Sequence, residues 1–463
     1  MNFSAFGEKF TRKTGILELM EDLAAASRAA SGGKGSPDGA ATAATAATAT
    51  TEATNASTPR LCMLGGGNPA RIPAMEAVWK ARMTDLLSDD EKFGRLLGTY
   101  DSADGMSGFR SSLAALFSRE YGWDLGPENI CVTNGSQVAV WYLLNLFSGP
   151  DTSGRKRRVL FPLMPEYVGY ADQAASESAF VSCRPRIEKI GDRGFKYYVD
   201  IDAVEALLER DPHSIGALCV SRPTNPSGNV LTDAEIRTLA GLAARWSIPL
   251  IVDNAYGLPF PGIVFTDAKP WWDEHTVLSM SLSKIGLPST RTGIIIAGPQ
   301  IIRALASINA IASLATGTMG QAIVEPLIAS GELLRMSREI VRPFYLQKRG
   351  TALALIHDLF KSLPVRVHES EGAIFLWLWF EDMPIESREL YTRLKARNVL
   401  VIPGEYFSFG EFGDGSACAA WDHPRRCIRI NYSAPDDELS RGLFLVAQEV
   451  RNAYEGGRSR VIL

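Results

Sequence analysis

Residues 279–293 read SMSLSKIGLPSTRTG and place one lysine, Lys284, directly after an apolar run typical of a buried strand. Ser281 and Ser283 precede this lysine, and Arg291 follows it seven positions later. A lone lysine at the end of a strand usually just carries its charge into solvent. Its meaning here therefore depends on which groups the rest of the chain brings near it.

Short apolar runs alternate with helical patterns on both sides of this stretch. Runs that are apolar on both faces and separated by helices indicate a mainly parallel sheet. These runs are residues 129–135, 157–163, 214–221, 249–253, 275–281 and 292–298. From about residue 326, long helical patterns precede the strand-like runs GAIFLWLWF (372–380) and RCIRINYS (426–433), which indicates a second, smaller unit. We therefore predict an α/β fold: a large domain with a mainly parallel central sheet flanked by helices, plus a smaller α+β domain.

The predicted division of the chain follows these changes in pattern. Residues 24–58 are almost all Ala, Thr, Ser and Gly, without a large apolar side chain. Such a stretch cannot bury enough surface to offset the entropy of ordering it, so we predict a mobile insertion. The predicted units are an N-terminal arm (1–23), the insertion (24–58), the first part of the small domain (59–95), the large domain (96–325) and the rest of the small domain (326–463).

Composition narrows the function. The 463 residues carry a net charge of −4, which gives no electrostatic case for binding nucleic acid or an anionic membrane. The six cysteines form no CxxC pair and the five histidines show no metal-ligand spacing, so neither a disulfide framework nor a metal site is expected. The longest apolar run is too short to cross a bilayer, and the N-terminus lacks a signal-peptide core, so we expect a cytoplasmic protein, although organellar targeting stays open.

Four polar clusters stand where predicted strands end, which is the edge at which open α/β sheets bind ligands. TNGSQ (133–137) precedes a helix, so its amides and Ser136 suit a phosphate. In RPTNPSGN (222–229) two prolines fix the backbone around Asn225, and in VDNAYG (252–257) a buried acid, Asp253, needs a cation or several hydrogen bonds. The fourth cluster is SLSK itself with its arginine. Each cluster alone is a common turn, but together they supply an amine, an acid, an amide and an anion cup.

The order Gly-Ser, Asn, Asp-x-x-Tyr, Ser-x-Ser-Lys, Arg resembles that of the fold-type I aminotransferases of classes I and II. The strings LGGGNPA (64–70), RPTNPSGN, DNAYGLPFPGI (253–263) and SLSKIGLPSTRTG carry the resemblance, which covers nearly the whole chain apart from the insertion. It implies the PLP fold type I and pyridoxal 5′-phosphate (PLP) as cofactor. It also implies an amino acid and a 2-oxo acid as substrates, and a homodimer with shared active sites.

The resemblance also implies roles for individual residues. Lys284 condenses with the cofactor's aldehyde as a Schiff base and moves the substrate proton. Asp253 keeps the pyridine nitrogen protonated, and Asn225 and Tyr256 bond the cofactor's phenolic oxygen. Tyr167 stacks on the ring, although core packing is an alternative for it and for Tyr170. The phosphate cup is implied at Gly135, Ser136, Gln137, Ser281, Ser283 and Arg291.

Substrate contacts are implied on the other side of the cofactor. Arg429 pairs with the substrate carboxylate, Gly67 and Asn225 lie beside the substrate, and Tyr100 reaches the phosphate from the partner subunit. One departure from the family pattern stands out. The segment between Lys284 and the following Gly-Leu is one residue shorter than is common in the family, which leaves the reach of Arg291 open.

The sequence says least about which substrate is used. No second arginine stands in a motif position for a dicarboxylate, and GAIFLWLWF with the Ile16–Leu17 pair favours a small apolar pocket. We expect valine or a similar small aliphatic amino acid as donor and pyruvate as acceptor. An alanine or aromatic aminotransferase and a PLP lyase share the same cofactor residues and stay open. A regulator with an aminotransferase-like domain would need a DNA-binding module, which residues 1–60 do not offer.

Overall fold

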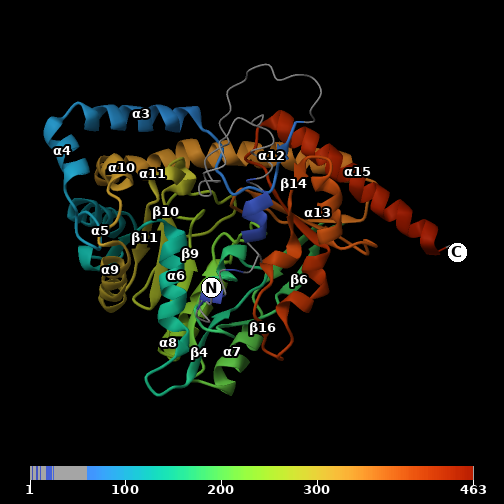
Figure 1. The fold of residues 1–463 in the computed structure, drawn as a ribbon, viewed down its shortest axis with the longest axis horizontal. Helices are drawn as coiled ribbons and strands as arrows, with labels where there is room; N and C mark the ends of the chain where they lie inside the picture. The colour runs from blue at the N-terminus through green and yellow to red at the C-terminus, as the bar shows by residue number, and fades with distance from the viewer. Residues whose placement is uncertain are drawn as a thin grey trace.

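The computed structural model describes residues 3, 7, 8, 11, 17–22, 24 and 60–461. The predicted insertion, residues 24–58, therefore lies outside the described residues except for residue 24. Within residues 60–461, two large sheets pack with helices into one body, with most of the central sheet left of the middle of Figure 1 and the second sheet to its right.

The central sheet is mainly parallel, as predicted. Its strands are β2 (Ile130–Thr133), β3 (Gly149–Pro150), β4 (Lys156–Phe161), β5 (Phe180–Ser182), β8 (Ile215–Ser221), β9 (Leu250–Asp253), β10 (Thr276–Ser281), β11 (Gly293–Ile296) and β16 (Glu411–Phe412). They are ordered β16-β5-β4-β8-β9-β10-β11-β2, with β3 paired to β4. The run from β16 to β10 is parallel throughout, whereas β11 is antiparallel to both of its neighbours.

Helices cover both faces of this sheet. The α-helices within residues 60–461 are α3 (Pro73–Leu87), α4 (Asp90–Gly98), α5 (Ser107–Tyr121), α6 (Ser136–Phe147), α7 (Ile201–Arg210), α8 (Asp233–Arg245), α9 (Pro299–Ser313), α10 (Met319–Ala329), α11 (Glu332–Met336), α12 (Arg342–Phe360), α13 (Ser387–Lys395), α14 (Asp422–Arg425) and α15 (Asp436–Val461). Side chains of α6 and α9 pack on one face, and those of α5, α8 and α10 pack on the other. Because every residue of β8 is buried, its sequence is apolar without alternation.

The second sheet joins distant parts of the chain. Its strands are β6 (Arg186–Ile190), β7 (Gly194–Tyr198), β12 (Val365–His368), β13 (Phe375–Phe380), β15 (Ile402–Pro403) and β17 (Cys427–Asn431), in the order β15-β17-β13-β12-β7-β6. The hairpin of β6 and β7 lies inside the range predicted for the large domain, yet β7 pairs in parallel with β12. The predicted domain boundaries stay predictions.

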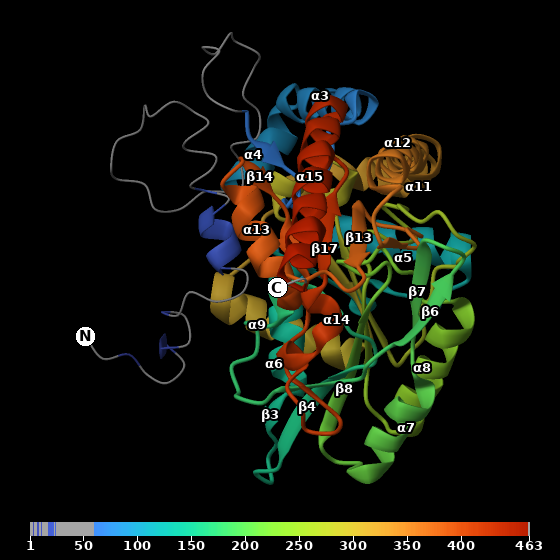
Figure 2. The same cartoon turned by 90° about the vertical axis from the view of Figure 1, so that its right-hand side faces the viewer.

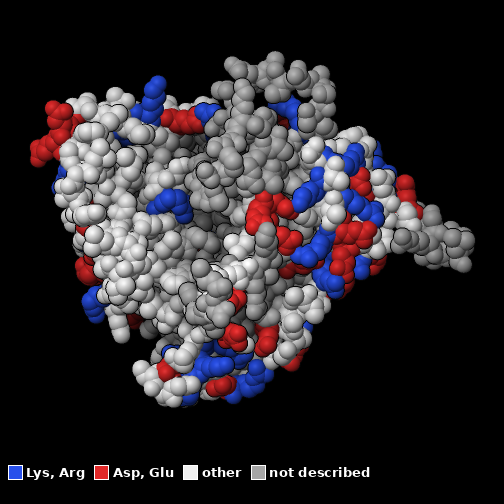
Figure 3. All heavy atoms as spheres, in the orientation of Figure 1, with Lys and Arg blue, Asp and Glu red and all other residues white. Residues whose placement is uncertain are grey.

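Shorter elements complete the second unit. The strands β1 (Cys62–Met63) and β14 (Val399–Leu400) form a parallel pair beside α15. Figure 2 shows α15 between α13 and α12, and it contacts both. Acidic and basic side chains are mixed over the right-hand part of the face drawn in Figure 3. Among the described residues, no helix combines the length and the apolar character needed to cross a membrane.

A buried ion pair fastens the second sheet to the loop that follows β8. Lys196 on β7 pairs with Glu371, and its ammonium also donates to Asn229 Oδ1 at 2.9 Å and to the Val230 carbonyl at 3.3 Å. Glu371 in turn accepts the backbone N–H of Val230 at 3.0 Å. The side chain of Lys196 is only 6% exposed, so its charge depends on these partners.

We expect Glu371→Ala to lower the free energy of unfolding by about 3–5 kcal/mol, because it leaves the Lys196 charge buried without its counterion. Urea unfolding followed by circular dichroism measures this loss. The double variant Lys196→Met/Glu371→Leu should recover most of it, since apolar side chains often replace a buried ion pair at little cost. A loss below about 1 kcal/mol for the single variant would show that the pair does not fasten the sheet.

Candidate active site

The predicted site residues meet in one pocket of about 280 Å³ at the carboxyl ends of β8, β9 and β10. The pocket lies between the central sheet and β17 of the second sheet, as expected for an open α/β sheet. The predicted residues that line it are Gly67, Ser136, Gln137, Tyr167, Asn225, Asp253, Tyr256, Ser281, Ser283, Lys284, Arg291 and Arg429. Gly135 lies directly behind this lining, and Tyr100 lies outside it with its side chain 79% exposed.

Lys284 lies in the short 3-10 turn η3 (Ser283–Ile285) that ends the apolar strand β10. Its Nζ donates to the Gly67 carbonyl at 2.5 Å and lies 5.2 Å from the ring centre of Tyr256. Burial is the main cause that lowers the pKa of Lys284 to about 7, and the charges of Arg429 and Arg291 add to it. The amine is therefore close to its neutral, nucleophilic form at physiological pH.

Asp253 ends β9 and is held from two sides. Its Oδ2 accepts the Tyr170 hydroxyl at 2.5 Å, and its Oδ1 accepts the N–H of Ala255 at 3.0 Å. Burial raises the pKa of Asp253, while these hydrogen bonds and the charge of Lys284 work against that rise. Such a carboxyl, buried at the end of the pocket, fits a protonated ring nitrogen.

Two residues near Asp253 were missed by the sequence reasoning. For Tyr170 the sequence indicated core packing as an alternative and predicted no bond to Asp253, yet its hydroxyl donates to Asp253 Oδ2. Glu166, completely buried, bonds the backbone and the side chain of Ser221. A charged residue inside the otherwise apolar and aromatic run PLMPEYVGY (162–170) is the sequence signal that could have singled out Glu166.

The anion cup forms where α6 begins. Ser136 is the first residue of α6, so backbone N–H groups of its first turn face the pocket end. Gly135 has a φ of 93°, and a Cβ there would lie 2.1 Å from Nη2 of Arg291. Only a glycine therefore lets the guanidinium come this close. Arg291 lines the same pocket as Lys284, so the shorter segment between them does not keep it away.

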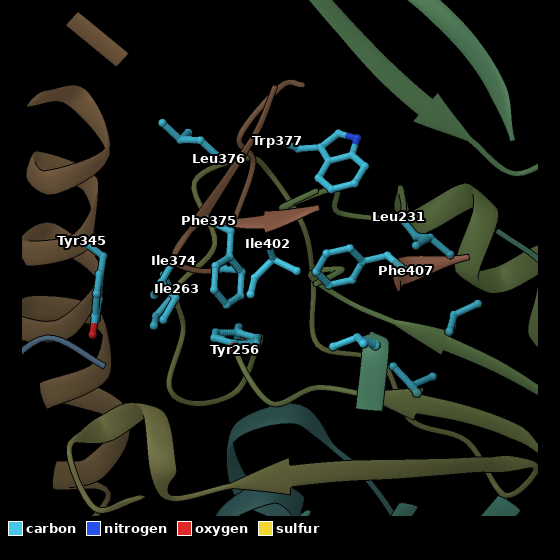
Figure 4. Close-up of a cluster of buried hydrophobic side chains, with 14 of the residues drawn as sticks. Leu231, Tyr256, Ile263, Tyr345, Ile374, Phe375, Leu376, Trp377, Ile402 and Phe407 are labelled. Atoms are coloured by element: carbon cyan, nitrogen blue, oxygen red, sulfur yellow. The ribbon is translucent and has the colours of Figure 1, made fainter. Parts of the chain in front are cut away.

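Arg429 on β17 faces the pocket with a charge that no carboxylate neutralises among the described residues. It donates to Asn225 Oδ1 at 2.7 Å and to the Gly65 carbonyl at 2.6 Å. Its guanidinium also lies 4.2 Å from the ring centre of Phe375 and 5.2 Å from that of Phe407. Both rings belong to the cluster of buried side chains drawn in Figure 4. Burial lowers the pKa of Arg429 to about 10. An incoming carboxylate would supply the missing counterion.

The N-terminal helical residues 17–22 form an apolar wall of the pocket. Leu19 and Met20 line it together with Ile402, whereas Leu17 does not. Ile16 lies outside the described residues, and the apolar side chains of this segment that line the pocket are those of Leu19 and Met20 among the residues described.

This helical segment is held against α13 and the neighbouring turn by polar contacts. Glu18 accepts the Tyr406 hydroxyl at 2.9 Å, and Asp22 accepts the Tyr391 hydroxyl at 2.7 Å and Lys395 Nζ at 2.6 Å. The hydrogen bonds and the ion pair of Glu18 and Asp22, on one face of this helical segment, therefore hold the apolar wall in position.

Comparison with known proteins agrees with this geometry. The family model "Aminotransferase class I and II" matches residues 67–443. The chain therefore belongs to the class I and II aminotransferases, which depend on PLP, and the lysine, the acid and the anion cup described above fit that cofactor.

Full-length relatives sharpen the comparison. The chain is 43% identical to the valine–pyruvate aminotransferase of Escherichia coli over 454 residues, 98% of this chain and 99% of that protein. A putative amino-acid aminotransferase of Psychrobacter arcticum is 39% identical with a TM-score of 0.87, over 98% and 99% of the two chains. The valine–pyruvate aminotransferase of Salmonella typhimurium is 44% identical with a TM-score of 0.78, over 85% of this chain and 96% of that one.

The lowered pKa of Lys284 leads to a test on the protein without cofactor. Only the neutral amine reacts with trinitrobenzenesulfonate, so labelling of Lys284 should rise with pH, reach half its maximum near pH 7 and level off above it. Peptide mass spectrometry of samples labelled for short times at several pH values measures this profile. In a denatured control the same lysine should reach half-maximum near pH ~10.4. A folded-state midpoint as high as the denatured one would contradict the environment described for Lys284.

Proposed function

We propose that this chain transfers the amino group of valine, or of a similar small aliphatic amino acid, to pyruvate, which gives 2-oxoisovalerate and alanine. One observation carries the substrate class: among the described residues that line the pocket, the cations are Lys284, Arg291 and Arg429. Lys284 supplies the amine that condenses with the cofactor, Arg291 lies at the anion cup, and Arg429 would pair with the α-carboxylate of the substrate. The acidic side chain of a donor such as aspartate or glutamate would then be buried without a cationic partner, which costs free energy.

The apolar wall supports the same choice. Leu19, Met20 and Ile402 line an apolar part of the pocket, which suits a branched aliphatic side chain. The similarity to two valine–pyruvate aminotransferases, at 43% identity over 98% of this chain and 44% over 85% of it, supports valine and pyruvate in particular.

The roles that we propose for the site residues follow from their positions. When bound, PLP supplies an aldehyde for condensation with an amine and a ring that accepts electrons from the substrate. Lys284 is the residue that holds the aldehyde and carries the proton on its Nζ, and Asp253 holds the ring proton. Asn225 and Tyr256 orient the cofactor, Tyr167 lies against its ring, and the Tyr256 hydroxyl stays protonated because burial raises its pKa.

We also propose a homodimer whose interface is the end of the molecule formed by α3, α4 and α9 (Figure 1). Large apolar side chains are exposed there: Met83, Leu87, Phe93, Leu97, Ile311 and Leu314. A second copy would cover them. Tyr100 follows α4 at this end, and its exposed hydroxyl would reach the anion cup of the partner.

The role of Lys284 is tested by removing its amine. Lys284→Ala should abolish transamination but still bind PLP without a covalent bond, because the anion cup and Asp253 are untouched. Borohydride reduction followed by peptide mapping should attach the cofactor to Lys284 in the unmodified chain. Attachment to a different lysine would remove the basis of the proposed roles.

The substrate choice is tested by single half-reactions. The PLP-loaded enzyme should react with valine at a higher kcat/KM than with alanine, phenylalanine, aspartate or glutamate, measured by the change in cofactor absorbance. One or two methylenes are worth only about 1–3 kcal/mol, so 2-aminobutyrate and isoleucine should also react. Met20→Ala, which shortens the apolar wall, should shift the preference toward longer aliphatic donors. A best kcat/KM with aspartate or glutamate would overturn the proposed substrate class.

A further inference from the structure

Glu166 is a second buried carboxyl close to the active site that no proposed step uses. Its side chain has no exposed surface, and it does not line the pocket itself. Its Oε1 accepts the backbone N–H of Ser221 at 2.8 Å, and its Oε2 lies 2.6 Å from Ser221 Oγ. The N–H of Tyr167 also points to Oε2 at 3.2 Å. The carboxyl is thus fixed in one position.

Hydrogen bonds connect Glu166 to Asp253 without a break. Ser221 Oγ lies 3.2 Å from the hydroxyl of Tyr170, and either group can be the donor. The Tyr170 hydroxyl donates to Asp253 Oδ2 at 2.5 Å. Because Tyr170 has a single proton and gives it to Asp253, its oxygen is free to accept the proton of Ser221.

The charges around this chain decide which carboxyl holds a proton. The titratable groups that face Glu166 are Asp253, Tyr170 and Cys219, and no cation pairs with Glu166 among the described residues. Two buried carboxyls in one network do not both ionise easily. The protonated form of Lys284 favours ionised Asp253, whereas no cation lies beside Glu166 among the described residues. Hydrogen bonds from Ser221 and Tyr167 lower the pKa of Glu166, but burial raises it by more. The proton therefore stays on Glu166.

We propose that Glu166 is an uncharged acid that donates its proton to Ser221 Oγ. The Ser221 hydroxyl then donates to Tyr170, and Tyr170 donates to Asp253, so that all the bonds run in one direction and hold Asp253 ionised. Glu166 is thus a positioning residue that acts through two hydroxyls. Its benefit to the reaction rests on the proposed function, in which ionised Asp253 holds the ring proton, but its protonation state does not.

This direction of the bonds depends on pH. Burial, together with the charge of Asp253, raises the pKa of Glu166 to about 8. When Glu166 ionises above that pH, the Ser221 hydroxyl turns toward it and Tyr170 loses its donor. Because the pKa is higher in the folded than in the unfolded chain, the contribution of Glu166 to stability is complete at low pH and is lost as pH rises toward about 8.

Glu166→Gln isolates this effect in the protein without cofactor. The Gln side chain has nearly the same shape, donates through its NH₂ group as the protonated acid donates through its O–H, and does not titrate. The ratio of the unfolding equilibrium constants of the unchanged chain and the variant should rise about tenfold per pH unit from about pH 5 to about pH 8 and then level off. Urea unfolding at matched protein concentration measures it. A ratio independent of pH would overturn the proposal.

Infrared spectroscopy tests the proton directly and does not depend on a variant that folds. In protein carrying ¹³C-carboxyl glutamate, the isotope-shifted carbonyl band of one protonated glutamate should be present at neutral pH and disappear as pH rises through about 8. Glu166→Gln should lack the band. Glu405→Gln should keep it, since the Glu405 carboxylate forms an ion pair with Arg388 at 3.0 Å. No protonated-glutamate band at neutral pH would overturn the proposal.

Binding of PLP to the cofactor-free protein separates this proposal from the proposed function. The dissociation constant should increase above about pH 8 in the unchanged chain and much less in Glu166→Gln. Tyr170→Phe, which breaks the chain of bonds, should weaken binding at neutral pH by about tenfold or more, the effect of one pKa unit at Asp253. Covalent attachment at a lysine other than Lys284 would reject the proposed function and leave the infrared result intact. A missing infrared band together with normal transamination would reject the proposal for Glu166 and leave the proposed function intact.

Discussion

The guanidinium of Arg429 joins three segments that lie far apart in the sequence. It projects from β17 of the second sheet, donates to Asn225 after β8 of the central sheet and to Gly65 after β1. All its partners are neutral, so the buried charge is oriented but not neutralised. The contact between the two sheets therefore leaves the Arg429 guanidinium without an anionic partner among the described residues. The other residues that line the pocket lie around this cation.

The same charge acts on the other side of the pocket. Arg429 and Arg291 both lower the pKa of Lys284, while Asp253 raises it, so the amine, the acid and the two guanidinium groups form one electrostatic unit. A bound dianion at the cup and a bound carboxylate at Arg429 would each weaken the repulsion on Lys284. Occupation of the pocket thus feeds back on the basicity of its central amine.

Local sequence patterns predicted the buried strands of the central sheet and the charged residues at their ends. Buried strands such as β8 are recognisable because both faces are covered, and Lys284 and Asp253 are recognisable because a charge ends an apolar run. The partner of β7 could not be read in this way, because nothing in residues 194–198 specifies pairing with β12. The link from Tyr170 to Asp253 was hidden for the same reason, since a buried tyrosine in a core and one in a polar network have the same local sequence.

The pairing of β2 with β11 has a consequence for the synthesis of the chain. β2 leaves the ribosome first among the strands of the central sheet, but its neighbour β11 is the last of the contiguous set, and β16 at the opposite edge is made later still. Until β11 emerges, β2 carries backbone groups without their partner in the sheet, although α5, which is made earlier, already contacts β2. Long-range closure of this kind is slow. The nascent polypeptide therefore carries this unpaired strand while residues 134–292 are made, about a third of the chain, and is open to aggregation during that interval.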